Sequence, residues 1–316
     1  MNYELHRNGY EPSTMNTRIN YLNAIFMLAS AAAAMFIPFE LFLLSYAILG
    51  PAHYLTEISW LKQRQFFTLK RYDFIFIAVV AIVSLVLKLP YANLVYYTFG
   101  LSFILLVLKN NVSRVLAFAV LIIAGYFLLT NNLLRTIFGL YIPTLIHVYI
   151  FTGAFLLFGA LKQKIVSGYV AFFTFLICPL LLCVILPGMH AQPTQWAIQN
   201  YGHFKNLNTV SLRNQTLNVY TNQASIILTR LIAFAYTYHY INWFSKTKII
   251  NWHRIPFTWA VIIVLVWMAS VGLYFLNYKL GIKWLFILSL AHVILEFPLN
   301  YRSFAGIYKF IGSLVH

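Results

Sequence analysis

Two short segments of this sequence place a histidine four residues before a glutamate. His53 precedes Glu57 in the stretch AILGPAHYLTEISW, and His292 precedes Glu296 in the stretch LAHVILE. Residues four apart lie on one face of a helix, so each pair would bring an imidazole and a carboxylate together. Neutral imidazole is a common ligand of iron, copper and zinc, and a neighbouring carboxylate can bind the metal or orient the ring. The spacing therefore predicts metal chemistry.

Both pairs lie within a strongly apolar chain. Of its 316 residues, 61% are hydrophobic and 9% are charged, whereas an ordinary soluble domain is about 25% charged. The composition predicts an all-α, polytopic helical membrane protein with one membrane domain over residues 1–316, surrounded by membrane lipids. The net charge of +16 reflects 22 basic residues against 6 acidic ones. The basic residues lie between apolar segments, which favours loops facing anionic lipid over nucleic-acid binding.

Crossing the hydrocarbon core of a bilayer takes about 20 mostly apolar residues. Ten segments meet this requirement, and the division between the first two rests on Pro38 and Glu40 within one long apolar stretch. The predicted spans are residues 20–36, 39–60, 73–89, 91–108, 114–131, 136–160, 166–187, 223–245, 256–277 and 282–299. Each histidine–glutamate pair therefore lies inside a span.

Lysine and arginine in the connections predict the orientation, because cytoplasmic loops carry the excess of these residues. Ten spans put fifteen basic residues on the side of the N-terminus and six on the other side, while Arg230 lies inside a span. Both termini should therefore be cytoplasmic, and we expect a multi-pass protein of a bacterial inner membrane. The six basic residues of the other side are Lys88, Arg135, Lys205, Arg213, Lys279 and Lys283.

Four histidines fall inside spans that all run in the same direction through the membrane. His53, His147, His239 and His292 lie at similar depth, at the midplane or somewhat toward the cytoplasmic half. A central charge in a span costs about 2.5–3.5 kcal/mol, so ionisable residues there are candidates for function. We expect the four imidazoles to converge and bind iron, copper or zinc. Alternatively, each histidine forms a separate hydrogen bond between helices.

Three further residues of the spans enter the candidate site. Glu57 and Glu296 are expected either to bind the metal or to orient the imidazoles. Arg230 lies about nine residues before His239. It could pair with a backbone carbonyl, reach toward the interface or bind a substrate carboxylate. No catalytic acid, base or nucleophile follows from the sequence.

The segments around these histidines resemble the bacterial Brp/Blh β-carotene 15,15′-dioxygenases. Ile48–Glu57, with the sequence ILGPAHYLTE, is similar to the family's Gly-x-Pro-His-Gly-Ala-x-Asp segment. Phe234–Phe244 is similar to an aromatic-rich helix that carries later histidines of the family. Leu290–Glu296 resembles its C-terminal Pro-His segment, and His147 would match the remaining helix-borne histidine. These short motifs follow the family's order over most of the chain.

The resemblance implies a non-haem iron, Fe²⁺, held by histidines in a membrane bundle and activating dioxygen beside a tunnel for a long polyene. Three positions depart from the family. Glu57 stands in place of the aspartate, Tyr54-Leu55 in place of Gly-Ala, and Trp243 where a second histidine would follow His239 by four residues. His292 or a glutamate could replace the missing ligand.

Three classes of function are compatible with these residues. The leading one is a membrane metalloenzyme acting on an apolar isoprenoid or lipid-like substrate that contacts Tyr54, Trp243 and Arg230. The resemblance, rather than the spacing, implies that its chemistry is that of an iron oxygenase. The second is a proton- or ion-coupled transporter that uses the same histidines and glutamates. The third is a structural or binding protein without chemistry. The HxxxH and HxxHH signatures of membrane desaturases and hydroxylases are absent from the sequence, which argues against that enzyme class.

Overall fold

The structure is a computed structural model that describes residues 14–63, 79, 90–185, 192–204, 218–246 and 255–315. Within these ranges every regular element is a helix and none is a strand. The predicted all-α class is therefore confirmed. The helices are α1 Thr14–Phe36, α2 Pro38–Leu44, η1 Ser45–Leu49, α3 Gly50–Gln63, α5 Tyr91–Val107, α6 Asn111–Thr130, α7 Asn132–Thr136, η2 Ile137–Tyr141, α8 Ile142–Thr144, η3 Leu145–Phe151, α9 Thr152–Gln163, α10 Val166–Val184, α11 Gln195–Tyr201, α13 Gln223–Ser245, α14 Phe257–Leu276 and α15 Tyr278–Val315.

Seven helices in the described ranges are long and apolar enough to cross a membrane. These are α1, α6, α10 and α14, together with three longer runs, Pro38–Leu61, Asn132–Gln163 and Tyr278–Gly312. The last two runs join several shorter elements or continue past an internal proline, Pro298. The chain is therefore an integral membrane protein by the length and composition of its helices.

Three of the ten predicted spans are not among the seven. The span over residues 91–108 forms α5, which is apolar but has only 17 residues. The span over residues 223–245 forms α13 with the same bounds, but Arg230, His239 and several Ser, Thr and Tyr side chains make it more polar than the seven. The span over residues 73–89 lies outside the described residues, apart from Val79.

Helix α13 lies in the interior of the bundle. It packs against α1, α2, α3 and α10 and against both η1 and η3. Its buried residues include Ser225, Thr229, Arg230, Thr237 and His239. Because neighbouring helices cover it, these polar groups can find partners in protein rather than facing hydrocarbon. The most polar of the long helices is thus also a central one.

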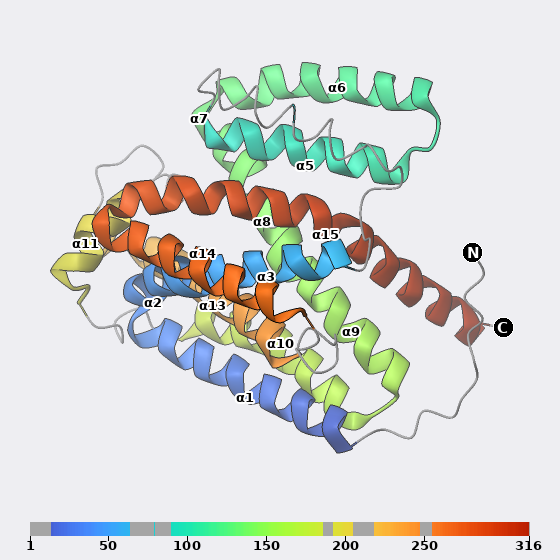
Figure 1. Ribbon diagram of the computed structural model, residues 1–316, viewed down its shortest axis with the longest axis horizontal. Helices are drawn as coiled ribbons and strands as arrows, with labels where there is room; N and C mark the ends of the chain where they lie inside the picture. The colour runs from blue at the N-terminus through green and yellow to red at the C-terminus, as the bar shows by residue number, and fades with distance from the viewer. Residues whose placement is uncertain are drawn as a thin grey trace.

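Helices α5 and α6 form a pair beside the main bundle. Figure 1 shows the two side by side, with α5 between α6 and α15, and α5 packs against both. Helix α5 also packs against η2, where a Cβ on Gly139 would lie 2.5 Å from the carbonyl oxygen of Ala92 and 2.7 Å from its Cβ. Real Cβ atoms do not approach backbone this closely, so Gly139 permits the contact between η2 and α5.

We expect the Gly139→Ala variant to unfold at a lower temperature than the wild type, with a loss of about 1–3 kcal/mol from overpacking. Gly159→Ala is the matched control, because a Cβ at Gly159 meets nothing within 4 Å and alanine favours the helix by about 1 kcal/mol. Thermal unfolding in detergent, followed by circular dichroism, measures both. Equal midpoints for the two variants would show that the Gly139 contact does not constrain the fold.

Candidate metal centre

The four histidines of the spans surround one small region of the interior. His53 comes from α3, His147 from η3, His239 from α13 and His292 from α15, and none is more than 7% exposed. Going around the four rings, neighbouring centroids are 4.7 Å (His53–His239), 4.9 Å (His239–His147), 4.8 Å (His147–His292) and 5.2 Å (His292–His53) apart. The centroids of His239 and His292, which face each other across this ring, lie 6.5 Å apart.

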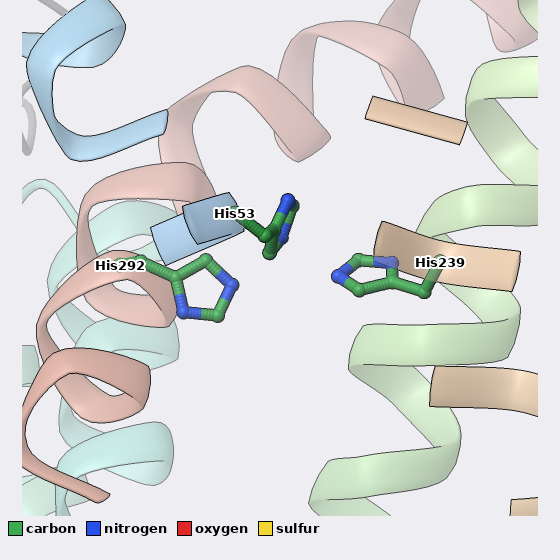
Figure 2. Close-up of side chains that lie close together, drawn as sticks. All are labelled: His53, His239 and His292. Atoms are coloured by element: carbon green, nitrogen blue, oxygen red, sulfur yellow. The ribbon is translucent and has the colours of Figure 1, made fainter. Parts of the chain in front are cut away.

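These spacings suit imidazoles around a metal ion. A ring whose nitrogen binds an ion at about 2.0–2.1 Å has its centroid about 3.2 Å from the ion, so two rings on opposite sides lie about 6.5 Å apart. Two groups have ligand atoms that all lie within 4.8 Å of one another: His53, His239 and His292, and His147, His292 and Glu296. Figure 2 shows the first group, whose imidazoles point toward a shared space. Donors of one ion lie at most about 4.2 Å apart, so binding would draw the rings slightly inward.

Proline residues are preceded by π-helical turns in two of the helices that carry these histidines. Proline has no N–H and cannot donate to the carbonyl one turn earlier. Before Pro51, the Gly50 N–H donates to the Ser45 carbonyl five residues back, and before Pro143 the Ile142 N–H donates to the Ile137 carbonyl. A second π-helical segment, η3, then carries His147 itself. Such turns widen a helix and rotate the residues that follow, and they are frequent at functional sites.

The hydrogen bonds of His292 define which of its nitrogens is available. Nδ1 lies 2.7 Å from the backbone carbonyl oxygen of Ser289. A carbonyl only accepts, so Nδ1 carries the proton and Nε2 presents a lone pair. That Nε2 lies 3.1 Å from the Nε2 of His147. Two nitrogens bound side by side to one ion at about 2.1 Å would stand about 3 Å apart.

In a neutral His147, the single ring proton has no placement that satisfies both neighbours while Glu296 is ionised. On Nδ1, which lies 3.1 Å from Glu296 Oε2, it leaves two Nε2 lone pairs facing each other. On Nε2, it turns the Nδ1 lone pair toward the carboxylate. A metal ion bound at these lone pairs removes the conflict, and so does a second proton on His147, whose two N–H groups would then face Glu296 and His292. A divalent ion would also balance the charges of two buried carboxylates, Glu57 and Glu296, which are costly without compensation.

The other two histidines also present nitrogens for a ligand. His239 Nδ1 lies 3.1 Å from the hydroxyl of Thr152, and its buried Nε2 has no hydrogen-bond partner among the described residues. His53 Nε2 lies 3.1 Å from Glu57 Oε2 but without hydrogen-bond alignment, and in the described part of the chain neither nitrogen has a hydrogen-bond partner. Buried polar atoms without partners are destabilising. Metal coordination would satisfy them, so the donor set fits a metal ion.

The two histidine–glutamate pairs differ in the structure. Glu57 contacts His53 on its own helix, as the four-residue spacing predicts. Glu296 instead contacts His147 of another helix at 3.1 Å, while His292 is held by the carbonyl of Ser289. Glu296, His147 and His292 therefore form one connected group that links η3 to α15.

The three substrate-binding candidates lie at different places. Tyr54 stacks on His292 with ring centroids 4.2 Å apart, and its hydroxyl hydrogen-bonds that of Tyr240 at 2.7 Å. Trp243 donates from Nε1 to the Thr56 hydroxyl at 2.8 Å, with its ring 5.8 Å from that of His53. Arg230 is fully buried and donates to the Ile185 carbonyl at 3.0 Å, the backbone pairing that was one of its predicted alternatives.

An apolar cavity of about 660 Å³ leads to this centre. Tyr54, Ser289 and His147 line it next to the histidine cluster, and rings such as Tyr46, Tyr236, Phe99 and Phe286 line it elsewhere. Neither Arg230 nor Trp243 is among its lining residues. No sequence signal points to the roles of Thr152 and the Ser289 carbonyl, because any hydroxyl or backbone group on a neighbouring turn could have taken them.

The fold and the cluster define a class: an all-helical membrane protein with a buried histidine–glutamate site that could bind a metal ion. No family model matches the chain, and neither a curated protein nor a solved structure matches it.

We expect the Thr152→Val variant to bind a divalent metal about tenfold to a hundredfold more weakly, because His239 loses the hydroxyl that orients its ring. Thr152→Ser keeps the hydroxyl and should bind like the wild type. Titration of metal-stripped protein with Fe²⁺ or Zn²⁺, followed calorimetrically, compares the three. A valine variant with wild-type affinity would exclude the orienting role of Thr152.

Proposed function

We propose that this chain is an integral-membrane, metal-dependent enzyme, a non-haem iron oxygenase that acts on an apolar isoprenoid or other lipid-like substrate. One observation carries the proposal. Four buried imidazoles from four helices meet together with two buried carboxylates, and one of these imidazoles, His147, lines an apolar cavity of about 660 Å³. Cavities of roughly 300–1,000 Å³ lined by apolar groups, with a few polar groups converging at one point, are the usual form of small-molecule sites.

The donor set favours iron as the metal. Two histidines and one carboxylate are a donor combination of non-haem iron oxygenases, and His147, His292 and Glu296 have ligand atoms within 4.8 Å of one another. His53 and His239 would add nitrogen donors from the other side. Copper and zinc also bind imidazole, and they are the alternatives that metal analysis would separate.

The bound iron would supply activation of dioxygen. The chain's own residues would hold the iron, keep water away and position the substrate: the aromatic walls bind an apolar chain, and Tyr54 fixes the plane of His292 by stacking on it. The resemblance to the Brp/Blh family adds cleavage of a polyene double bond. In that reaction both atoms of dioxygen end in two carbonyl groups, so no separate reductant is needed.

The ten-span arrangement belongs to the same proposal. The seven long apolar helices together with α5 and α13 make nine, and the tenth would lie in residues 73–89, outside the described part of the chain. An even number of spans puts both termini on one side, which the distribution of lysine and arginine identifies as cytoplasmic. We propose a bacterial inner membrane as the location.

We expect the purified wild-type protein to contain about one iron per chain by elemental analysis. Alanine variants of His53, His239 and His292 should each lose most of it, because all three donate to the same cluster. His203→Ala is the matched control, since His203 is exposed and lies outside the cluster. Circular dichroism spectra and gel-filtration profiles show whether each variant is folded. A folded, active wild type without any transition metal would contradict the proposal and favour proton- or ion-coupled transport.

β-Carotene is the substrate that the resemblance implies, and expression in a carotenoid-producing bacterial host tests it. Retinal that forms with the wild type and is missing with His292→Ala would support carotene cleavage. Iron-loaded protein that forms no retinal would limit the proposal to other lipid-like substrates.

A further inference from the structure

The cavity that leads to the histidine cluster carries cations where it opens. Lys279 and Lys283 are exposed, and Arg135 is half-buried. All three line the cavity, together with the exposed His203. No Asp or Glu is found among the lining residues in the described part of the chain. The open end of the cavity is therefore strongly positive, while its inner walls are aromatic and aliphatic.

The general basicity of the chain does not account for this group. Lysine and arginine are concentrated on the predicted cytoplasmic side, which carries fifteen of them against six on the other side. Arg135, Lys279 and Lys283 are three of those six. The other three, Lys88, Lys205 and Arg213, lie outside the described residues, so every basic residue of that side that the structure describes lines one cavity. Lysines often anchor the end of a helix at the membrane interface. That role alone does not require them to line the same cavity as an arginine of another helix.

Helix α15 runs along the whole cavity. Its lining residues are Lys279, Ile282, Lys283, Phe286, Ser289, Leu290 and Val293. They follow the three- and four-residue spacing of one helix face. His292 lies nine residues after Lys283 and thirteen after Lys279. At 1.5 Å per residue, the cluster is about 14–20 Å deeper than the cations, roughly half of the hydrocarbon thickness of a bilayer or somewhat more.

Arg135 adds a cation to the cavity lining from a second helix. It lies in α7, and its Nη2 donates to the Asn132 side chain at 2.6 Å, which fixes the direction of the guanidinium. Asn132 also lines the cavity. Arginine and lysine together are the usual ligands of carboxylate and phosphate groups, and the planar guanidinium can bind two oxygens at once.

We propose that the cavity takes an amphiphile with an anionic head group, a carboxylate or a phosphate, that binds at Arg135, Lys279 and Lys283. Its apolar chain then extends along α15 past Phe286 and Val293 to His147. The inference deepens the proposed function. It rests on that function in one respect, namely that the apolar tail of the amphiphile is the part that reacts. It assigns the position of reaction as well: a carbon about 14–20 Å from the head group, whereas the head itself stays unreacted.

The test uses metal-free protein in nanodiscs of phosphatidylcholine, a lipid without net charge. Binding of palmitate, farnesyl phosphate and methyl palmitate is measured for the wild type. We expect palmitate, farnesyl phosphate or both to bind at least tenfold more tightly than the neutral ester, and the acid that binds identifies the head group. In the Lys279→Gln/Lys283→Gln double variant this binding should weaken about tenfold, because each partly exposed ion pair contributes modestly. Affinity for the ester should not change.

The matched control is the Lys162→Gln/Lys309→Gln double variant. It removes the same charge from two exposed lysines that do not line the cavity, so it should keep wild-type affinity. Equal weakening in the two double variants would reduce the effect to general attraction of anions to a basic protein and overturn the inference. Equal affinity of palmitate, farnesyl phosphate and methyl palmitate for the wild type would overturn it as well.

The measurement separates this inference from the proposed function. Because the protein is metal-free, head-group selectivity that depends on Lys279 and Lys283 supports the amphiphile site even if elemental analysis finds no iron. If elemental analysis finds about one iron per chain but binding shows no head-group selectivity, the metalloenzyme proposal is kept and the anionic substrate is rejected.

Discussion

The structure depends on one constraint: a polar group inside a membrane must find its partners in protein. Water is missing there, and each unsatisfied group is destabilising by several kcal/mol. The chain meets the constraint by gathering polar side chains around α13, where the Ser45 hydroxyl hydrogen-bonds that of Thr237 at 2.7 Å and the Thr152 hydroxyl contacts His239. Pairing is incomplete at the histidine cluster, where His53, Glu57, His147, His239 and Glu296 all have buried atoms without a hydrogen-bond partner among the described residues; a few isolated groups elsewhere, such as the Tyr274 hydroxyl and the Asn300 amide, share this property. The concentration of such atoms on imidazoles and carboxylates is what makes the cluster a candidate metal site.

Much of the fold could be predicted from hydropathy, because a helix that crosses the membrane facing lipid has to be an apolar segment of about 20 residues. The bounds of α13 agree with the predicted span over 223–245, yet its polarity indicates a helix shielded by its neighbours, which hydropathy does not distinguish. The π-helical turns before Pro51 and Pro143 could not be predicted. Proline indicates a disturbed helix, but whether the chain kinks, breaks or inserts one residue depends on packing around it.

The site was predictable to the extent that depth decides which residues can meet. His53, His147, His239 and His292 share a depth in the sequence, and the structure brings them together. Partner choice was less predictable. The four-residue spacing gives the contact of Glu57 with His53, but Glu296 meets His147, because the carbonyl of Ser289 holds His292. Competition between a side chain and a backbone group one turn away is decided by rotamers and fractions of an ångström, which spacing does not encode. The sequence likewise places Lys279 and Lys283 at the start of one predicted span and Arg135 at the start of another. Only the cavity of the structure shows that the three line the same space.

Helix α15 carries residues of two regions that the sequence analysis treated separately, the cations that line the cavity and the histidine cluster. Its first two turns place Lys279 and Lys283 at the opening, its next turns line the cavity, and His292 follows at the depth of the other histidines. A rigid helix fixes the distance between a head-group site and a metal centre far better than a loop would. A positive opening raises the local concentration of anionic amphiphiles and orients them head outward. The apolar walls of the cavity then admit only the apolar tail of the amphiphile. In the proposed site, the change of polarity along one face of α15 would therefore select both the substrate and the carbon that reaches the metal.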